Sequence, residues 1–150
     1  MKKTKNLFDL TDKVAIISGS SRGIGLAIAT AFAEYGAHVV LSSRSQDAVD
    51  KAAKELSQKG YSVMAQACHI GEKAQRENLV NKALEKFGRI DIFVNNAAIN
   101  PVYEPLEKMT ESVYEKMMNV NVKAAFALSN LCFSHSVSYT HLTLPTKRIV

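Results

Sequence analysis

A glycine-rich segment near the N-terminus has the residue types and spacing of a loop that binds phosphate groups. It reads Ser18-Gly19-Ser20-Ser21-Arg22-Gly23-Ile24-Gly25, so its glycines follow the pattern G-x-x-x-G-x-G. Gly19 would permit a sharp turn, Gly23 a close approach of the backbone to a pyrophosphate, and Gly25 close packing of a helix. A helix that begins here would direct unpaired N–H groups and its positive dipole end at the phosphates. The alternative is a tight turn without a ligand.

Two arginines and a serine indicate which dinucleotide the loop would bind. Proteins that bind NAD place an acid near the end of the second strand to hold the ribose 2′-hydroxyl. Here that place holds Ser43, followed by Arg44. Ser43 could donate a hydrogen bond to a 2′-phosphate, and the guanidinium of Arg44 has a geometry suited to phosphate. With Arg22 in the glycine loop, this pattern favours NADP(H), and the alternative is that Arg44 is a solvated loop charge.

The segments that must position these residues alternate between short apolar runs and amphipathic stretches, as strands and helices do. The expected strands are Val14–Ile17, His38–Leu41, Tyr61–Cys68 and Ile90–Val94, and the expected helices are Arg22–Tyr35, Asp47–Lys59, Glu72–Phe87 and Thr110–Phe133. Thr110 has the side chain of an N-cap. This alternation predicts an α/β fold: a doubly wound, parallel Rossmann sheet whose strand order begins 3-2-1-4.

Composition and charge narrow the classes of partner. The chain has 150 residues, of which 47% are hydrophobic, and this predicts one domain with a core. It carries 19 basic and 14 acidic residues, a net charge of +5, but no aromatic residues interleave with the N-terminal lysines as a nucleic-acid platform requires. No apolar run approaches the roughly 20 residues of a membrane span. We therefore expect neither a nucleic-acid nor a membrane partner.

The cysteines and histidines favour a reduced compartment and give no metal site. Cys68 and Cys132 are far apart and belong to no Cys-x-x-Cys pair, which favours buried thiols over a disulfide scaffold. The four histidines show no ligand spacing with cysteine or acid, so no metal is expected. Residues 1–10 contain no apolar region of a signal peptide, and we expect a cytoplasmic protein.

Three motifs in order resemble the short-chain dehydrogenase/reductase family over about residues 10–133. The first is the glycine loop, with Ser18 at the place of the family's threonine. The second is Asn95-Asn96-Ala97-Ala98, close to the family's Asn-Asn-Ala-Gly, and the third is Asn119-Val120-Asn121-Val122. Further stretches resemble the NADP-dependent carbonyl reductase and retinol dehydrogenase group of this family: Gly36-Ala-His-Val-Val, Ser42-Ser-Arg44, Cys68-His69 and Asn96-Ala-Ala-Ile-Asn-Pro101.

The resemblance implies roles for particular residues. Asn121 matches the helix asparagine of the family's catalytic tetrad, which supports a water-mediated proton relay. His69 stands where the family commonly has an aspartate that contacts the adenine; it could still bond the adenine edge, or it could be solvated or locally satisfied. The expected cofactor-binding residues are Gly19, Ser21, Arg22, Gly23, Ile24, Gly25, Ser43, Arg44, His69, Ile70, Asn95 and Ala97.

The family's proton-transfer residues are not found in this sequence. The family has a serine and a Tyr-x-x-x-Lys beyond the long helix, but Tyr103, Tyr114 and Tyr139 are followed four residues later by Glu107, Met118 and Thr143. Residues 136–146 resemble one reading frame of a transposon mosaic-end adapter used in sequencing libraries. We therefore interpret residues 1–135 as the dinucleotide-binding half of a short-chain dehydrogenase and residues 136–150 as a non-native tail. The alternative is a divergent natural C-terminus.

Three functions are compatible with these observations. The family resemblance implies an NADP(H)-dependent oxidoreductase that interconverts a carbonyl and an alcohol of a small-molecule substrate by hydride transfer. It also implies a homo-oligomer in the full-length form, because the family often pairs the long helix across a dimer interface. The missing residues instead favour a catalytically inactive nucleotide-binding module. A methyltransferase on a similar sheet is weaker, since it would not need the paired arginines. A sheet of four strands would also leave Ile90–Val94 at an edge and part of the helix face at Met117, Val120, Ala124 and Leu128 exposed, so we expect poor folding or aggregation.

Overall fold

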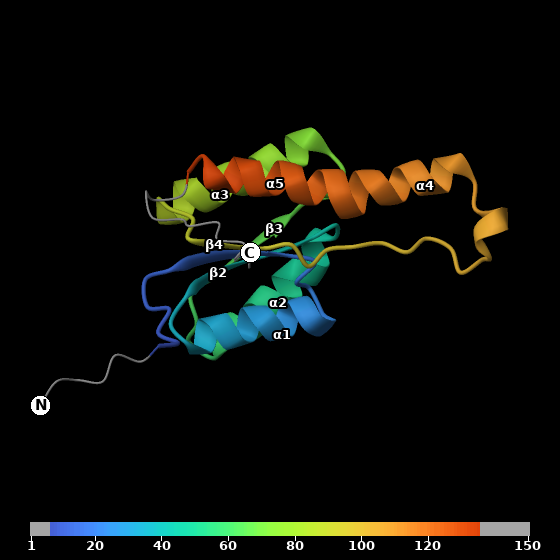
Figure 1. Cartoon of the computed structure of the whole chain (residues 1–150). Helices are drawn as coiled ribbons and strands as arrows, with labels where there is room; N and C mark the ends of the chain where they lie inside the picture. The colour runs from blue at the N-terminus through green and yellow to red at the C-terminus, as the bar shows by residue number, and fades with distance from the viewer. Residues whose placement is uncertain (1–6, 136–150) are drawn as a thin grey trace, which may run out of the picture.

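A computed structural model describes residues 7–135, which form one sheet with helices on both faces (Figure 1). The tail interpreted above as non-native lies outside the described residues. The elements in chain order are β1 Val14–Ser18, α1 Gly23–Glu34, β2 His38–Ser43, α2 Gln46–Gln58, β3 Val63–Ala67, α3 Lys73–Phe87, β4 Ile92–Val94, a 3₁₀ turn Leu106–Lys108, α4 Glu111–Met118, a π-helical turn Asn119–Lys123, and α5 Ala124–Phe133.

The sheet confirms the predicted α/β fold and strand order. Its four strands are parallel in the order β3-β2-β1-β4. Ile16 in β1 pairs with Val40 on one side and Phe93 on the other. All five residues of β1 are buried, as expected for a central strand covered on both faces. The four carboxyl ends therefore meet along one edge, where open α/β sheets bind ligands.

Two apolar layers hold the helices to the sheet. Helices α1 and α2 cover one face, and α3 and α5 cover the other (Figure 1). The first layer joins alternate strand residues such as Ile17 and Leu41 to Ala29 and Val49. The second joins Ile16 and Val40 to residues of α3 and α5 such as Leu79 and Leu128. Alternation along β1 and β2 thus divides their side chains between the two layers.

The long helix is continuous but not uniformly α-helical. Thr110 is its N-cap, as predicted, and its side chain accepts a hydrogen bond from the Val113 N–H at 3.4 Å. The expected helix over residues 110–133 is interrupted by the π-helical turn, a feature that periodicity in the sequence does not reveal. The expectation of a partly exposed inner face is wrong for Val120, Ala124 and Leu128, which are buried in the layer with α3.

Strand β4 is shorter and less covered than the sequence indicates. It spans Ile92–Val94 instead of Ile90–Val94, and its three residues are half-buried because only β1 pairs with it among the described residues. Similarly, β3 is Val63–Ala67 instead of the expected Tyr61–Cys68. Both are edge strands of the described sheet, where fewer neighbours maintain the strand pairing.

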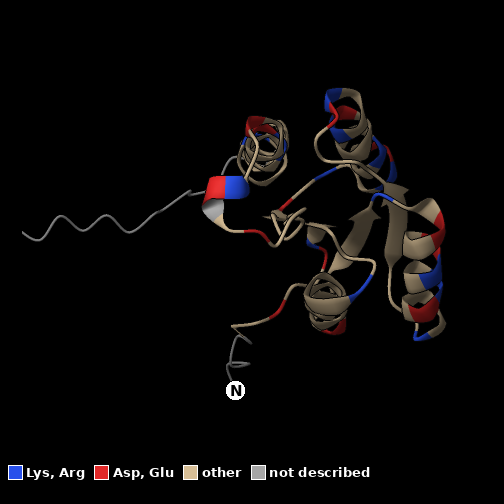
Figure 2. Ribbon diagram, turned by 90° about the vertical axis from the view of Figure 1, so that its right-hand side faces the viewer, with Lys and Arg blue, Asp and Glu red and all other residues tan. Residues whose placement is uncertain are grey.

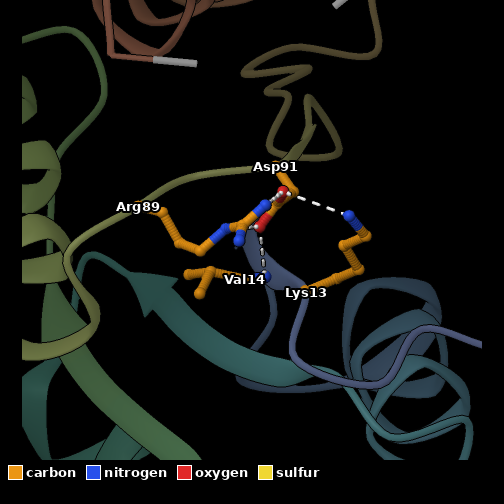
Figure 3. A network of polar contacts seen from close by, with 4 residues as sticks. All are labelled: Lys13, Val14, Arg89 and Asp91. Carbon is orange, nitrogen blue, oxygen red and sulfur yellow. Dashed lines mark hydrogen bonds and ion pairs between the residues drawn. The ribbon is translucent and has the colours of Figure 1, made fainter. Parts of the chain in front are cut away.

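An ionic cluster joins β1 to the start of β4 at the amino end of the sheet (Figure 3). Asp91 accepts a hydrogen bond from the Val14 N–H at 2.9 Å and a bidentate contact from the Arg89 guanidinium, and it lies 3.6 Å from Lys13 Nζ. Burial alone would raise the pKa of the Asp91 carboxyl. The bonds from Arg89 and Val14 and the charges of Arg89 and Lys13 outweigh burial and hold this pKa below its usual value.

The described helices include none that is both long and apolar enough to cross a membrane.

Figure 2 shows basic and acidic residues alternating along the outer helices at the right of the view. Cys68 and Cys132 are both buried and unbridged, as the sequence predicts.

Candidate functional site: a cavity at the carboxyl ends of the strands

A cavity of about 390 Å³ lies where the four strands end. Each strand or the loop after it contributes to the wall, and the π-helical turn closes one side. The lining residues are Gly19, Ser21, Arg22, Gly23, Ser43, Arg44, Cys68, His69, Ile70, Asn96, Ala97, Ala98, Ile99 and Val120. Most of the predicted cofactor-binding residues are therefore brought together, although they come from four separate loops.

The glycine loop has a backbone that other residues would strain. Gly19 and Gly23 have φ of +68° and +58°, in the left-handed region. A Cβ added to Gly19 would lie 2.9 Å from the Ala97 Cα, whereas one added to Gly23 would meet nothing within 4 Å. Gly19 therefore lets the loop after β1 touch the loop after β4, and Gly23 borders open space.

The N-terminus of α1 is left without a cap of its own. Arg22 is the N-cap residue, its backbone is extended, and its side chain makes no capping bond. No acid stands in the first turn. The first N–H groups of the helix thus need an acceptor, which a phosphate would supply. Ile24, predicted among the cofactor residues, does not line the cavity and its side chain is 75% exposed.

Gly25 also lies outside the cavity wall, but it sets the position of the helix. It is buried, and a Cβ there would collide with the carbonyl of Gly19 and lie 2.5 Å from Asn96 Nδ2. The close contact is therefore between the first turn of α1 and the two loops beside it. A side chain at this position would push the helix away from the cavity.

Ser18 and Asn96 fix the glycine loop to the loop after β4, a role that the sequence analysis missed. Ser18 Oγ donates to the Val94 carbonyl and accepts from the N–H groups of Asn96 and Ala97, all at 3.1 Å. Asn96 Nδ2 donates to the carbonyls of Ser18 and Gly19, both at 3.0 Å. The available signal was a polar side chain at or just after the end of an apolar run, and this signal is compatible with loop positioning as well as with ligand contact.

Ser20, also missed, fixes the same loop to β2. Its Oγ donates to the Ile17 carbonyl at 2.7 Å and accepts from the Ser42 N–H at 2.9 Å. Its own N–H donates to the Ser42 carbonyl at 2.9 Å. Ser20 is fully buried, so its hydroxyl serves the backbone and does not face the cavity.

Two positive charges stand at the cavity without acidic neighbours. Arg22 and Arg44 are exposed, and their side chains make no ion pair or hydrogen bond within residues 7–135. The described wall contains no Asp or Glu. Ser43 lines the wall beside Arg44, with its Oγ 3.2 Å from the Ser45 carbonyl. An anion bound here would meet two unpaired guanidinium groups and no opposing carboxylate.

The cavity wall after β3 contains a buried thiol, Cys68. Burial raises the pKa of the Cys68 thiol to about 11, although the charge of Arg76 opposes this rise. The thiol therefore stays protonated at neutral pH and does not act as a nucleophile. His69 and Ile70 follow it in the wall, and the His69 ring nitrogen Nδ1 accepts a bond from the Gly71 N–H at 3.1 Å.

The two predicted asparagines face neighbouring elements instead of the cavity. Asn121, in the π-helical turn, accepts from the Ile99 N–H at 2.8 Å and donates to the Ile99 carbonyl at 2.9 Å. Its side chain thus holds the loop whose Ile99 lines the cavity. Asn95 Nδ2 donates to Ser129 Oγ in α5 at 3.0 Å. In residues 7–135 no three His, Cys, Asp or Glu side chains gather as metal ligands.

Comparison with known proteins gives relatives that are described as dehydrogenases or reductases. The family profile described as short chain dehydrogenase matches residues 13–139. Dehydrogenase/reductase SDR family member 4 of Oryctolagus cuniculus is 50% identical over 115 residues, which cover 77% of this chain and 44% of the relative. The chain therefore spans less than half the length of this curated relative.

Solved structures agree in fold as well as in sequence. A short-chain type dehydrogenase/reductase from Mycobacterium marinum superposes with a TM-score of 0.81 at 31% identity, over 86% of this chain and 52% of that one. A hydroxysteroid dehydrogenase from Escherichia coli gives a TM-score of 0.80 at 33% identity, over 89% and 53%. In both comparisons the matched part of this chain covers about half of the solved chain.

Proposed function

Because the chain belongs to the short-chain dehydrogenase family, we propose that its cavity binds NADP(H) for an oxidoreductase that interconverts a carbonyl and an alcohol. The family implies a nicotinamide dinucleotide, NAD or NADP. The observation that favours NADP(H) is the pair of guanidinium groups, Arg22 and Arg44, which have no partner within residues 7–135 and lie beside a described cavity wall without any acid. A 2′-phosphate adds negative charge at this place, whereas the acid that would bind a free 2′-hydroxyl is replaced by Ser43.

The residues present fit such a cofactor in its phosphate half. The uncapped first turn of α1 and the open space beside Gly23 suit a pyrophosphate, and Ser21 lines the same cavity. The bound cofactor would supply hydride transfer. The chain's own residues would hold it, and Asn121 would keep the Ile99 segment of the wall in place.

Titration calorimetry of the 150-residue chain with NADP⁺ and with NAD⁺ tests the cofactor assignment. We expect the chain to prefer NADP⁺ by at least tenfold, because one charge-assisted hydrogen bond contributes about 1.5–3 kcal/mol. Equal affinities for the two cofactors would refute the assignment. Binding of neither cofactor would refute the dinucleotide site itself.

For catalysis, a second candidate function is a nucleotide-binding module without activity. The observation that favours it for these 150 residues is that no Tyr-x-x-x-Lys occurs among them, so the proton transfer that accompanies hydride transfer has no donor. We expect no detectable NADPH consumption with a panel of ketones and aldehydes, measured beside a full-length relative. Turnover comparable to that relative would show that other groups carry the proton.

An exposed apolar stripe supports a homo-oligomeric partner for the longer protein. Tyr114, Met118, Val122 and Phe126 recur every four residues along α4, the π-helical turn and α5, and these residues are 40–68% exposed. We propose that this face pairs with a second copy in a full-length form. Light scattering of a full-length form and its Phe126→Arg variant tests this: the variant is expected to be monomeric, and an unchanged oligomer would refute it.

A further inference from the structure

His69 stands at the end of the cavity where the base of the proposed cofactor would lie. It follows β3, and β3 pairs with β2, whose end carries Ser43 and Arg44. If these two residues receive the 2′-phosphate, the base attached to the same ribose lies at this end of the cavity. The inference below therefore rests on the proposed NADP(H) site.

The hydrogen bond to the His69 ring determines which of its nitrogens carries the proton. The Gly71 N–H points at Nδ1 with an N–N distance of 3.1 Å. A backbone N–H can only donate, so Nδ1 must offer a lone pair, and the neutral ring then carries its proton on Nε2. The contact requires glycine at position 71, because a Cβ there would lie 2.9 Å from His69 Cε1 and 3.1 Å from Nδ1.

Helix α3 and its N-cap residue Glu72 hold the backbone of this segment by three hydrogen bonds. The Gln75 side chain accepts from the His69 N–H at 2.7 Å, and the Glu72 N–H donates to the His69 carbonyl at 2.9 Å. Arg76, only 6% exposed, donates from Nη1 to the Ile70 carbonyl at 2.6 Å. The ring is thus oriented before any ligand arrives, which lowers the entropic cost of using it for recognition.

We infer that His69 is a neutral hydrogen-bond donor that recognises a ring nitrogen of the cofactor's adenine through its Nε2–H. Adenine offers acceptors on its ring nitrogens and donors only on its amino group. An acid at this position accepts from the amino group, whereas His69 with Nδ1 occupied by Gly71 has only a donor left. The polarity of base recognition is therefore reversed, and Gln75, Arg76 and Gly71 are positioning residues for it.

The first measurement decides the tautomer in the ligand-free chain. A long-range ¹H–¹⁵N correlation spectrum of the ¹⁵N-labelled chain near pH 7.5 distinguishes the two neutral forms, and the signal lost in His69→Asn assigns the ring. We expect the form protonated at Nε2, with its resonances shifting on addition of adenosine 2′,5′-bisphosphate. A form protonated at Nδ1, or resonances unmoved by a saturating amount of this probe, would overturn the inference.

Cofactor binding by two variants shows which of the two ring nitrogens of His69 contacts the ligand. In His69→Asn the amide oxygen stands near the place of Nδ1 and keeps the bond from Gly71, but nothing replaces Nε2–H. In His69→Gln the amide nitrogen stands near Nε2 and still donates. We expect His69→Asn to weaken binding of NADP⁺ and of adenosine 2′,5′-bisphosphate about fivefold, and His69→Gln to weaken it less than twofold. His135→Asn, at an exposed histidine, is the matched control and should bind like the starting chain.

The outcomes distinguish this inference from the proposed function. If the starting chain binds NADP⁺ and both variants match it, the inference is wrong and the NADP(H) site stands. If the starting chain binds no NADP⁺, the site and the inference fall together. Circular dichroism checks that His69→Asn keeps its fold, and if it does not, the tautomer and ligand-shift measurements on the starting chain decide.

Discussion

Replacing Arg44 with alanine should narrow the preference for NADP⁺ without abolishing dinucleotide binding. Arg44 is exposed and has no partner of its own within residues 7–135, so its removal leaves no buried charge and breaks no bond of the fold. The loss is then that of a charge-assisted hydrogen bond to the 2′-phosphate, about 1.5 kcal/mol for a solvated site. This corresponds to roughly a tenfold weaker affinity for NADP⁺ and an unchanged affinity for NAD⁺.

Titration calorimetry with both cofactors measures this difference, and two further variants sharpen it. Arg44→Lys keeps the charge but loses the paired donors, and should fall between the starting chain and Arg44→Ala. Lys51→Ala removes one positive charge from the exposed face of α2 away from the cavity and controls for net charge. If Arg44→Ala weakens NADP⁺ and NAD⁺ equally, or Lys51→Ala matches it, the reasoning on the 2′-phosphate is wrong.

Three other changes test the parts that support the site. Asp91→Asn should lower the free energy of unfolding by about 1.5 kcal/mol at pH 7, as measured by urea denaturation, because Arg89 and Lys13 lose their acid. Since the pKa of Asp91 in the folded chain lies below 3.8, its contribution to stability is complete above that pH and is lost as the pH falls below it. The free energies of unfolding of the starting chain and of Asp91→Asn should therefore converge in acid, and a difference that is the same at all pH values would contradict this. Gly19→Ala should abolish NADP⁺ binding and lower the melting temperature, because residue 19 has a φ of +68° and its Cβ would lie 2.9 Å from Ala97 Cα. Normal NADP⁺ binding by this variant would show that the loop can change its conformation to accommodate the Cβ. The starting chain should self-associate with rising concentration through the edge of β4, which only β1 pairs within residues 7–135, and amide protection in Ile92–Val94 should be weak; strong amide protection and a monodisperse species would count against this prediction.

The order of the sheet followed from the sequence because each strand and helix carries its own local signal. Val14–Ile17 is a short apolar run followed by Ser18 and Gly19, and Gly36 and Gly88 follow the ends of their helices with positive φ. What the sequence could not show is where packing ends: β3 and β4 are shortened because they lie at the edges of the described sheet. Likewise, the burial of Val120, Ala124 and Leu128 depends on α3, whose distance from them along the chain hides the contact.

The location of the site could be predicted from the sequence, but not which of its side chains face the cavity and which bond neighbouring loops. Parallel strands bring their carboxyl ends together, so residues after four strands had to meet near the glycine loop. Which of them face the cavity depends on bonds between loops far apart in sequence. Asn95 and Asn121 fit the family's motifs equally well, yet one bonds α5 and the other bonds Ile99.

Because of these hydrogen bonds between loops, a substitution can weaken cofactor binding without removing a residue that contacts the cofactor. Asn96 and Ser18 satisfy backbone groups of the glycine loop and of the loop after β4, and Asn121 does the same for Ile99. Removing any of these side chains would leave buried or half-buried backbone groups unpaired and shift a wall of the cavity. Such variants would weaken cofactor binding together with stability, whereas Arg44→Ala would weaken binding alone. Measuring both quantities in each variant therefore separates the residues that touch the ligand from those that hold the loops.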